Sequence, residues 1–168
     1  MAQPQRKIEN EHNLAAQDAV IEQIEISAPA QIVWDAITDP RQILQWWQEK
    51  DIAPIVSWDH ELKIGGQLSA RWSGSTGKAY LLKGTYLEVD PPKALAYSWE
   101  SDWVDCGSIS QVRWELLPTV KGTLLTVTHS GLRGYPEAVK DFGGGWPKVL
   151  RNLGEFISRS ADKSAQRK

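Results

Sequence analysis

This 168-residue chain has few of the residues that build structural or catalytic sites. Cys106 is the only cysteine, which excludes an intramolecular disulfide and a zinc site made of several thiolates. The three histidines, His12, His60 and His129, lie far apart and show no helical ligand pairing, so we expect no metal site. No Lys-Ser or Lys-Thr pair directly follows the glycines at 143–145, so they do not form a phosphate loop, and we expect no cofactor.

An excess of charge and a long hydrophobic run are also absent. With 19 Lys and Arg against 21 Asp and Glu, the net charge of −2 gives no reason to expect a nucleic-acid partner or an anionic membrane. No run of about 18 apolar residues occurs, so we expect no membrane insertion. The basic pair Arg6 and Lys7 has no apolar stretch behind it, so we expect no secretory signal. A single cysteine suits a reducing compartment, and we expect the protein in the cytoplasm.

Tryptophan, by contrast, is unusually frequent, with nine residues against two phenylalanines. The nine are Trp34, Trp46, Trp47, Trp58, Trp72, Trp99, Trp103, Trp114 and Trp146. Each indole buries a large area but carries an N–H that needs a hydrogen-bond acceptor. Two interpretations stay open: the rings fill the core, or they form the flat walls of a binding site with polar handles.

The polar ends of the chain enclose one segment with the patterns of a folded domain. Residues 1–18 carry charges of both signs and predict a disordered or loosely helical tail. Residues 161–168 predict a second, frayed end. No linker, repeat or low-complexity segment divides the remainder, so we expect one domain over 19–160, which is long enough to bury a sizeable core.

The central part of the chain alternates apolar and polar residues, which predicts β-strands. These strands are expected at 19–27, 55–58, 67–72, 80–89, 95–99, 111–116 and 124–129. Two short helices, 29–38 and 40–47, are expected after the first strand. Pro29 suits the first turn of one helix, and Asp39 can cap the other. The later strands are joined by short turns without intervening helices, which indicates an antiparallel meander.

A long amphipathic helix is predicted near the C-terminus, because apolar residues recur there at the spacing i, i+3, i+4 and i+7. They are Trp146, Val149, Leu150, Leu153, Phe156 and Ile157. The glycines at 143–145 cost a helix roughly 1 kcal/mol each, so we expect a separate helical turn at 136–142 and a restart at Pro147. A hinge or tight packing would explain these glycines. The apolar stripe has to be buried, and the concave sheet face is the available partner.

The order of these elements, together with a series of short motifs, resembles a known superfamily. The motifs are Ser27 to Pro29, Val33 to Pro40, Trp46-Trp47, Ile64 to Gly66, Gly84 to Pro92, Leu95 to Trp99, Thr126 to Leu132, and Gly145-Trp146 with Leu150 and Leu153. With them the chain resembles the SRPBCC (START-like, helix-grip) superfamily. Within it, the chain is similar to the homologues of the C-terminal domain of the heat-shock-protein-90 ATPase activator. The triple glycine and the segment Asp102 to Cys106 depart from the usual pattern of that group.

The resemblance covers residues 20–158 and implies an α+β helix-grip fold. In this fold a curved antiparallel sheet of six or seven strands wraps around a long C-terminal helix, with two short helices after the first strand. The superfamily that the chain resembles includes lipid carriers, hormone receptors, polyketide cyclases and co-chaperones. The fold that the resemblance implies is therefore not specific for one function.

The gap between sheet and helix is where the resemblance places a ligand, and apolar clefts with a few polar groups are typical binding sites. We predict that ten residues contact it: Trp46, Trp47, Trp72, Tyr97, Trp99, Trp114, Val127, His129, Trp146 and Leu150. Trp46, Trp47 and Trp146 would guard the opening, while Tyr97 and His129 would supply polar groups.

His129 shares a strand face with Leu125 and Val127, so we expect its side chain to point inward. It would then be a ligand-binding group or a general acid–base. The alternative is a buried imidazole paired with a neighbouring hydroxyl, such as that of a tyrosine.

No catalytic arrangement is recognisable, and we expect a non-catalytic carrier or sensor of a small hydrophobic molecule, lipid-like or aromatic. The resemblance implies an alternative, an interaction module that acts on a chaperone ATPase, with a chaperone as partner. A third hypothesis is an enzyme that cyclises an aromatic polyketide-type substrate, using His129 and a tyrosine. The sequence does not fix the oligomeric state.

Overall fold

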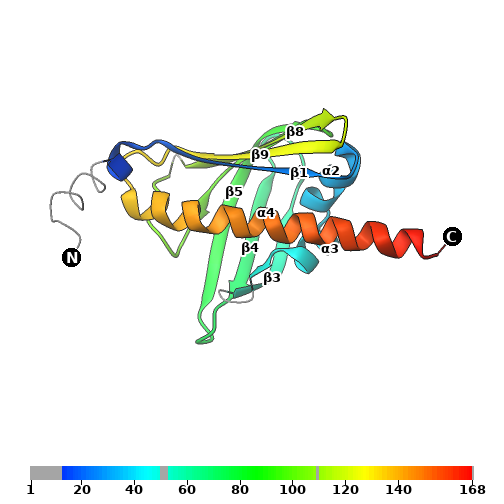
Figure 1. The fold of residues 1–168 in the computed structure, drawn as a ribbon. Coiled ribbons are helices and arrows are strands. Elements are labelled where there is room, and N and C mark those ends of the chain that lie inside the picture. The colour runs from blue at the N-terminus through cyan, green and yellow to red at the C-terminus, as the bar shows by residue number, and fades with distance from the viewer. Residues whose placement is uncertain (1–12, 50–52, 109, 168) are drawn as a thin grey trace, which may run out of the picture.

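The computed structural model describes residues 13–49, 53–108 and 110–167, which form an antiparallel sheet curled around one long helix (Figure 1). The strands are β1 (Ala19–Ile26), β2 (Gln48–Glu49), β3 (Ala53–His60), β4 (Gln67–Ser73), β5 (Ala79–Asp90), β6 (Ala94–Ser98), β7 (Glu100–Ser101), β8 (Gln111–Thr119) and β9 (Gly122–Ser130). The helices are α2 (Ala30–Thr38), α3 (Pro40–Trp46) and α4 (Pro136–Ala165). Most of the tail expected at 1–18 lies outside the described residues, and residues 13–16 form a turn of helix.

The sheet has the order β1-β9-β8-β6-β5-β4-β3-β2, with β7 paired to β5 off this path. Every pairing along it is antiparallel. The two-residue strands β2 and β7 are additions to the expected set, and the other strands are those that the sequence predicts. In Figure 1, α4 runs beside β1 and β9 and passes across β4 and β5. The α+β helix-grip fold predicted from the sequence is therefore confirmed.

The alternation of apolar and polar residues decides which face of the sheet meets the helix. On β8, Val112, Trp114 and Leu116 are buried, and the residues between them are more exposed. On β9, Val127 lies opposite Trp114 and His129 lies opposite Val112, and both are fully buried. A shift of one residue would turn this whole row to solvent, so burial fixes the register. The inward direction predicted for His129 is confirmed.

The junction of the two short helices is fixed by a cap that the sequence predicts. The Asp39 carboxylate accepts the backbone N–H of Arg41 at 2.9 Å, and Pro40 occupies the first turn of α3, where no N–H is needed. The Arg41 guanidinium also pairs with Asp39, at 3.0 Å. Together these contacts fix the start of α3, and the end of this helix places Trp46 and Trp47 on the concave side of the sheet.

The expected break in the C-terminal helix is wrong, because α4 runs unbroken through 143–145 with Pro147 inside it. Phe142 and Trp146 are buried on the same stripe, one turn apart and on either side of the glycines. Burial of a large apolar side chain contributes about 1.5–3 kcal/mol, and the stripe has several, so packing outweighs the local cost of glycine and proline. Tight packing is also not the reason for the glycines, since an added Cβ at any of them would meet nothing within 4 Å.

The last turns of α4 continue past the sheet. The helix reaches Ala165, within the segment 161–168 that the sequence predicts as a frayed end, and residues 158–165 are exposed (Figure 1). Despite the length of α4, none of the described helices is long and apolar enough to cross a membrane.

Gly143→Ala is expected to stabilise the protein. Alanine is favoured over glycine inside a helix by roughly 0.5–1 kcal/mol, and space is free at this position. The free energy of unfolding in urea should therefore rise by about this amount. Gly84→Ala is the matched control, because a Cβ there would lie 2.3 Å from the carbonyl oxygen of Ser98 and should destabilise β5. Loss of stability in both variants would contradict the continuous helix.

Candidate functional site

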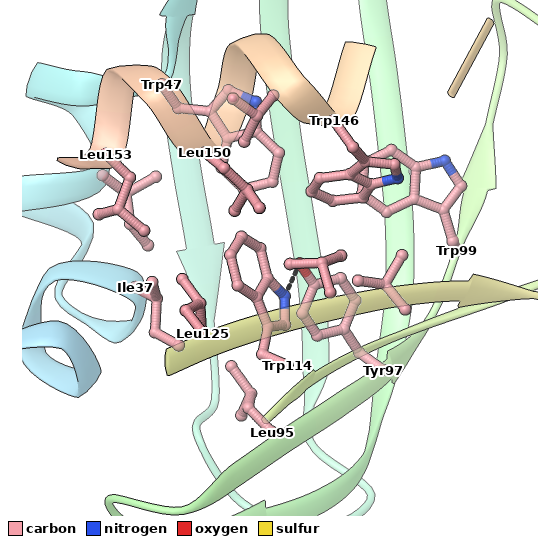
Figure 2. Close-up of a cluster of buried hydrophobic side chains, with 14 of the residues drawn as sticks. Ile37, Trp47, Leu95, Tyr97, Trp99, Trp114, Leu125, Trp146, Leu150 and Leu153 are labelled. Carbon is pink, nitrogen blue, oxygen red and sulfur yellow. Dashed lines mark hydrogen bonds between the residues drawn. The ribbon is translucent and has the colours of Figure 1, made fainter. Parts of the chain in front are cut away.

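The middle of the hollow between sheet and helix is filled by indole rings packed around Trp47, which is 6% exposed (Figure 2). The ring centroids around it lie at 5.2 Å for Trp46, 5.3 Å for Trp58, 5.7 Å for Trp72, 6.5 Å for Trp99, 6.2 Å for Trp114 and 6.0 Å for Trp146. Edge-on, tilted and stacked pairs all occur, as expected for favourable aromatic contacts. Of the two interpretations of the tryptophans, core filling therefore applies at the centre of the domain.

Three of these indoles, those of Trp46, Trp114 and Trp146, are held by hydrogen bonds as well as by packing. Trp46 donates to the carbonyl oxygen of Ala36 at 2.8 Å. Trp114 donates to the Tyr97 hydroxyl at 3.1 Å, which Figure 2 shows as a dashed line. Tyr97 is 1% exposed, and burial raises the pKa of its hydroxyl far above the usual value, so the group stays neutral.

His129 is buried with both ring nitrogens engaged. Trp146 donates its indole N–H to Nδ1 at 3.2 Å, so Nδ1 carries no proton. Nε2 then bears the hydrogen of the neutral ring and donates it to the Ser110 hydroxyl at 2.5 Å. Burial lowers the pKa of His129 to about 3. The imidazole is thus paired with a hydroxyl, as one interpretation of the sequence expects, although the hydroxyl belongs to a serine rather than a tyrosine.

A cleft with a volume of about 520 Å³ opens beside this core, along the first half of α4. Its other walls come from β4, β5 and the segment after β6. Its lining is mostly aromatic and consists of Trp47, Trp72, Tyr80, Trp99, Trp103, Lys140, Asp141, Phe142, Gly144, Gly145, Trp146, Lys148 and Val149. Figure 2 shows Trp47, Trp99 and Trp146 in the buried cluster next to α4, and all three also line the cleft.

Trp103 stands nearly perpendicular to three other rings of the cleft. Its ring makes angles of 71° with Trp72, 89° with Tyr80 and 87° with Trp99, at centroid distances of 5.7, 6.3 and 6.0 Å. Its N–H donates to the Asp141 carboxylate at 3.3 Å, which links the loop after β7 to α4. Although Asp141 is exposed by surface area, partial burial of its carboxyl group raises its pKa.

The cleft contains four of the ten residues predicted to contact a ligand: Trp47, Trp72, Trp99 and Trp146. The other six are buried in the core outside its lining; they are Trp46, Tyr97, Trp114, Val127, His129 and Leu150. Sequence reasoning missed Trp103 because it lies in a polar loop without periodicity. It missed Phe142 because the helix was expected to break beyond it, although the spacing to Trp146 is one helical turn. Ligand contact by the ten residues remains a prediction.

Residues 27–158 match the family described as Activator of Hsp90 ATPase homolog 1-like protein. The chain belongs to this family. The segment covers every strand of the sheet except β1, both short helices and α4 as far as residue 158. No relative among curated proteins matches the chain in sequence.

Several solved structures share the fold of this family member. A protein from Nitrosomonas europaea has a TM-score of 0.73 at 20% identity, over 86% of this chain and 97% of its own. One from Mesorhizobium loti has a TM-score of 0.68 at 28% identity, over 84% and 97%. An AHSA1-like protein from Aeromonas hydrophila has a TM-score of 0.71 at 19% identity, over 85% and 94%. At these identities the likeness concerns the fold.

No three His, Cys, Asp or Glu side chains of the described residues come together as a metal site.

Trp47→Ala is expected to be severely destabilising. Removing a buried indole leaves a cavity among six other rings, and such truncations cost about 3–5 kcal/mol. Chemical denaturation followed by far-UV circular dichroism would measure the loss. Trp103→Ala serves as the control, because its half-buried ring should cost clearly less. Equal losses of unfolding free energy in the two variants would contradict the role of Trp47 as the centre of the aromatic core.

His129 is expected to make stability depend on pH. The folded protein keeps His129 neutral down to about pH 3, whereas the unfolded chain protonates it near its ordinary pKa of 6.5. The unfolded state then binds more protons, so the contribution is complete above pH 6.5 and is lost as pH falls toward 3, by at most about 1.4 kcal/mol per pH unit.

Urea unfolding at about pH 7 and about pH 5 would measure this slope, first for the wild type and then for His129→Gln. The variant should be less stable at neutral pH but should lose less stability on acidification. Partial burial also lowers the pKa of His60, so His60→Gln is the matched control and should reduce the slope less. An unchanged slope in His129→Gln would show that the imidazole takes up a proton in the folded state.

Proposed function

We propose that the chain binds a small apolar molecule, with an aromatic or lipid-like body, in the cleft along the first half of α4. The observation that carries the proposal is a cleft of about 520 Å³ whose walls are mostly aromatic. The cleft lies beside the packed indole rings that fill the centre of the domain. Ligand sites typically have volumes of about 300–1,000 Å³ and mostly apolar walls with a few polar groups. Trp72, Trp99 and Trp103 offer ring faces and edges, and Lys140 and Asp141 are polar groups at its border.

Binding as a carrier or sensor is favoured over catalysis. His129, the candidate acid–base group, has both nitrogens occupied and lies outside the cleft lining. Tyr97, the other polar group predicted to contact a ligand, is buried beside Trp114 and also lies outside this lining. Neither group could reach a ligand in the cleft without opening the core.

Trp103→Leu is expected to weaken ligand binding by about three- to tenfold, because one aromatic contact contributes about 0.5–1.5 kcal/mol. The measurement is quenching of tryptophan fluorescence by a panel of fatty acids, sterols and flavonoids, followed by the affinity of the variant for whichever ligands saturate. Val120→Ala is the control, since Val120 is fully exposed in the turn between β8 and β9. If no member of the panel gives saturable quenching, the proposal is refuted.

A second candidate function is supported by the family match. The family name refers to activation of the Hsp90 ATPase, so the chain would act as an interaction module on such a chaperone. Purified chain added to an Hsp90 preparation should then raise its ATP hydrolysis. No stimulation and no co-purified chaperone would remove this alternative.

Native mass spectrometry of the purified protein separates the two functions in one measurement. A carrier should retain a co-purifying small molecule that adds a discrete mass and is lost in Trp103→Leu. An interaction module should show the mass of the bare chain and bind the chaperone with its cleft empty.

A further inference from the structure

The polar groups around the cleft that have no partner are mainly hydrogen-bond donors. Lys140 and Lys148 lie on α4 in the cleft lining, are exposed, and form no ion pair with any residue that the structure describes. Lys78 holds its ammonium 5.5 Å from the ring centroid of Tyr80, which also lines the cleft. Two lysines therefore line the aromatic cleft, and a third holds its ammonium group over the ring of a lining residue.

The inner wall adds a fourth donor. Trp99 is 3% exposed and lines the cleft, and its indole N–H is buried without an acceptor among the described residues. Trp46, Trp114 and Trp146 donate their indole N–H to an acceptor, whereas Trp58 is buried without one like Trp99 but lies outside the cleft lining. A buried donor without an acceptor is unfavourable, but the protein covers this N–H, so a ligand oxygen could accept it only after neighbouring side chains moved.

The acidic groups nearby do not balance these donors. Asp141 supplies the one carboxylate among the described lining residues, it already accepts the N–H of Trp103, and its raised pKa reflects a poorly solvated charge. Asp102 and Asp105 lie in the neighbouring loop outside the lining, where each accepts a backbone N–H. A cationic ligand would meet more like charge than opposite charge here.

We propose that the cleft selects a planar aromatic molecule that carries a carboxylate or a similar anionic oxygen group, paired with the ammonium groups of Lys140 and Lys148. The aromatic body follows from the lining of the cleft, which is mostly aromatic and in which Trp103 packs edge-on against Trp72 and Trp99. This inference rests on the proposed function, because it names the class of ligand for the same cleft.

Three probes of one shape and different charge test the inference: 2-naphthoate, 2-naphthamide and 2-naphthamidine. Their affinities for the protein of residues 1–168 are measured by isothermal titration calorimetry at low salt. We expect 2-naphthoate to bind roughly three- to tenfold more tightly than the neutral amide, because exposed ion pairs are individually weak. The amidinium should bind most weakly, and added salt should reduce the difference.

The double variant Lys140→Gln with Lys148→Gln should abolish the preference for the anion and leave affinity for the amide unchanged. The matched control is Lys121→Gln with Lys163→Gln, which removes two exposed lysines outside the cleft lining and changes the net charge equally. The control variant should keep the preference of the wild type.

The outcomes distinguish the inference from the proposed function. If the three probes bind equally, or the amidinium binds best, the cleft binds aromatic molecules but the inferred charge selection is wrong. A preference for the anion that survives in the double variant would overturn the role of the two lysines. If no probe binds at any salt concentration, the inference and the proposed function both fail for aromatic ligands.

Discussion

The burial of indole rings between the curved sheet and α4 is the interaction on which the rest of the structure depends. Trp47 arrives at the end of α3, Trp114 comes from β8 and Trp146 from α4, so one cluster joins three parts of the chain. Flat rings pack at many mutual angles, and each buries a large apolar area. The same cluster explains why α3 is short and capped by Asp39, since that cap fixes where Trp47 enters the hollow.

Packing on this cluster also explains the behaviour of α4. Local propensity alone would end a helix at Gly143 to Gly145, yet Phe142 and Trp146 hold both sides of the glycines against the sheet. Phe142 stacks on His129 at a centroid distance of 4.0 Å, and Trp146 donates to the same imidazole. Because His129 receives one contact from each side of the glycines, it couples the two halves of the helix and stays neutral while doing so.

The fold could be predicted from the sequence because its main signals are periodic and local. The alternation in β8 and β9 and the stripe from Trp146 to Ile157 specify which faces are buried. The site could be predicted only in part, since Trp99 and Trp114 both face inward and differ in where they lie along the hollow. Depth within a concave surface is set by sheet curvature, which no short sequence pattern encodes. Trp103 lies in a loop with no period at all, so only tertiary structure brings it to Trp72.

The cleft lies along the first half of α4 because side-chain volume is distributed unevenly along that helix. From Trp146 onward the stripe presents large apolar groups that close the hollow, whereas Gly144 and Gly145 border the cleft and have no side chain. An added Cβ would meet nothing there, so these glycines leave space rather than allow close packing. A helix with larger residues at these positions would narrow the opening beside Trp103. The space that these glycines leave beside α4 therefore bears on access to the cleft.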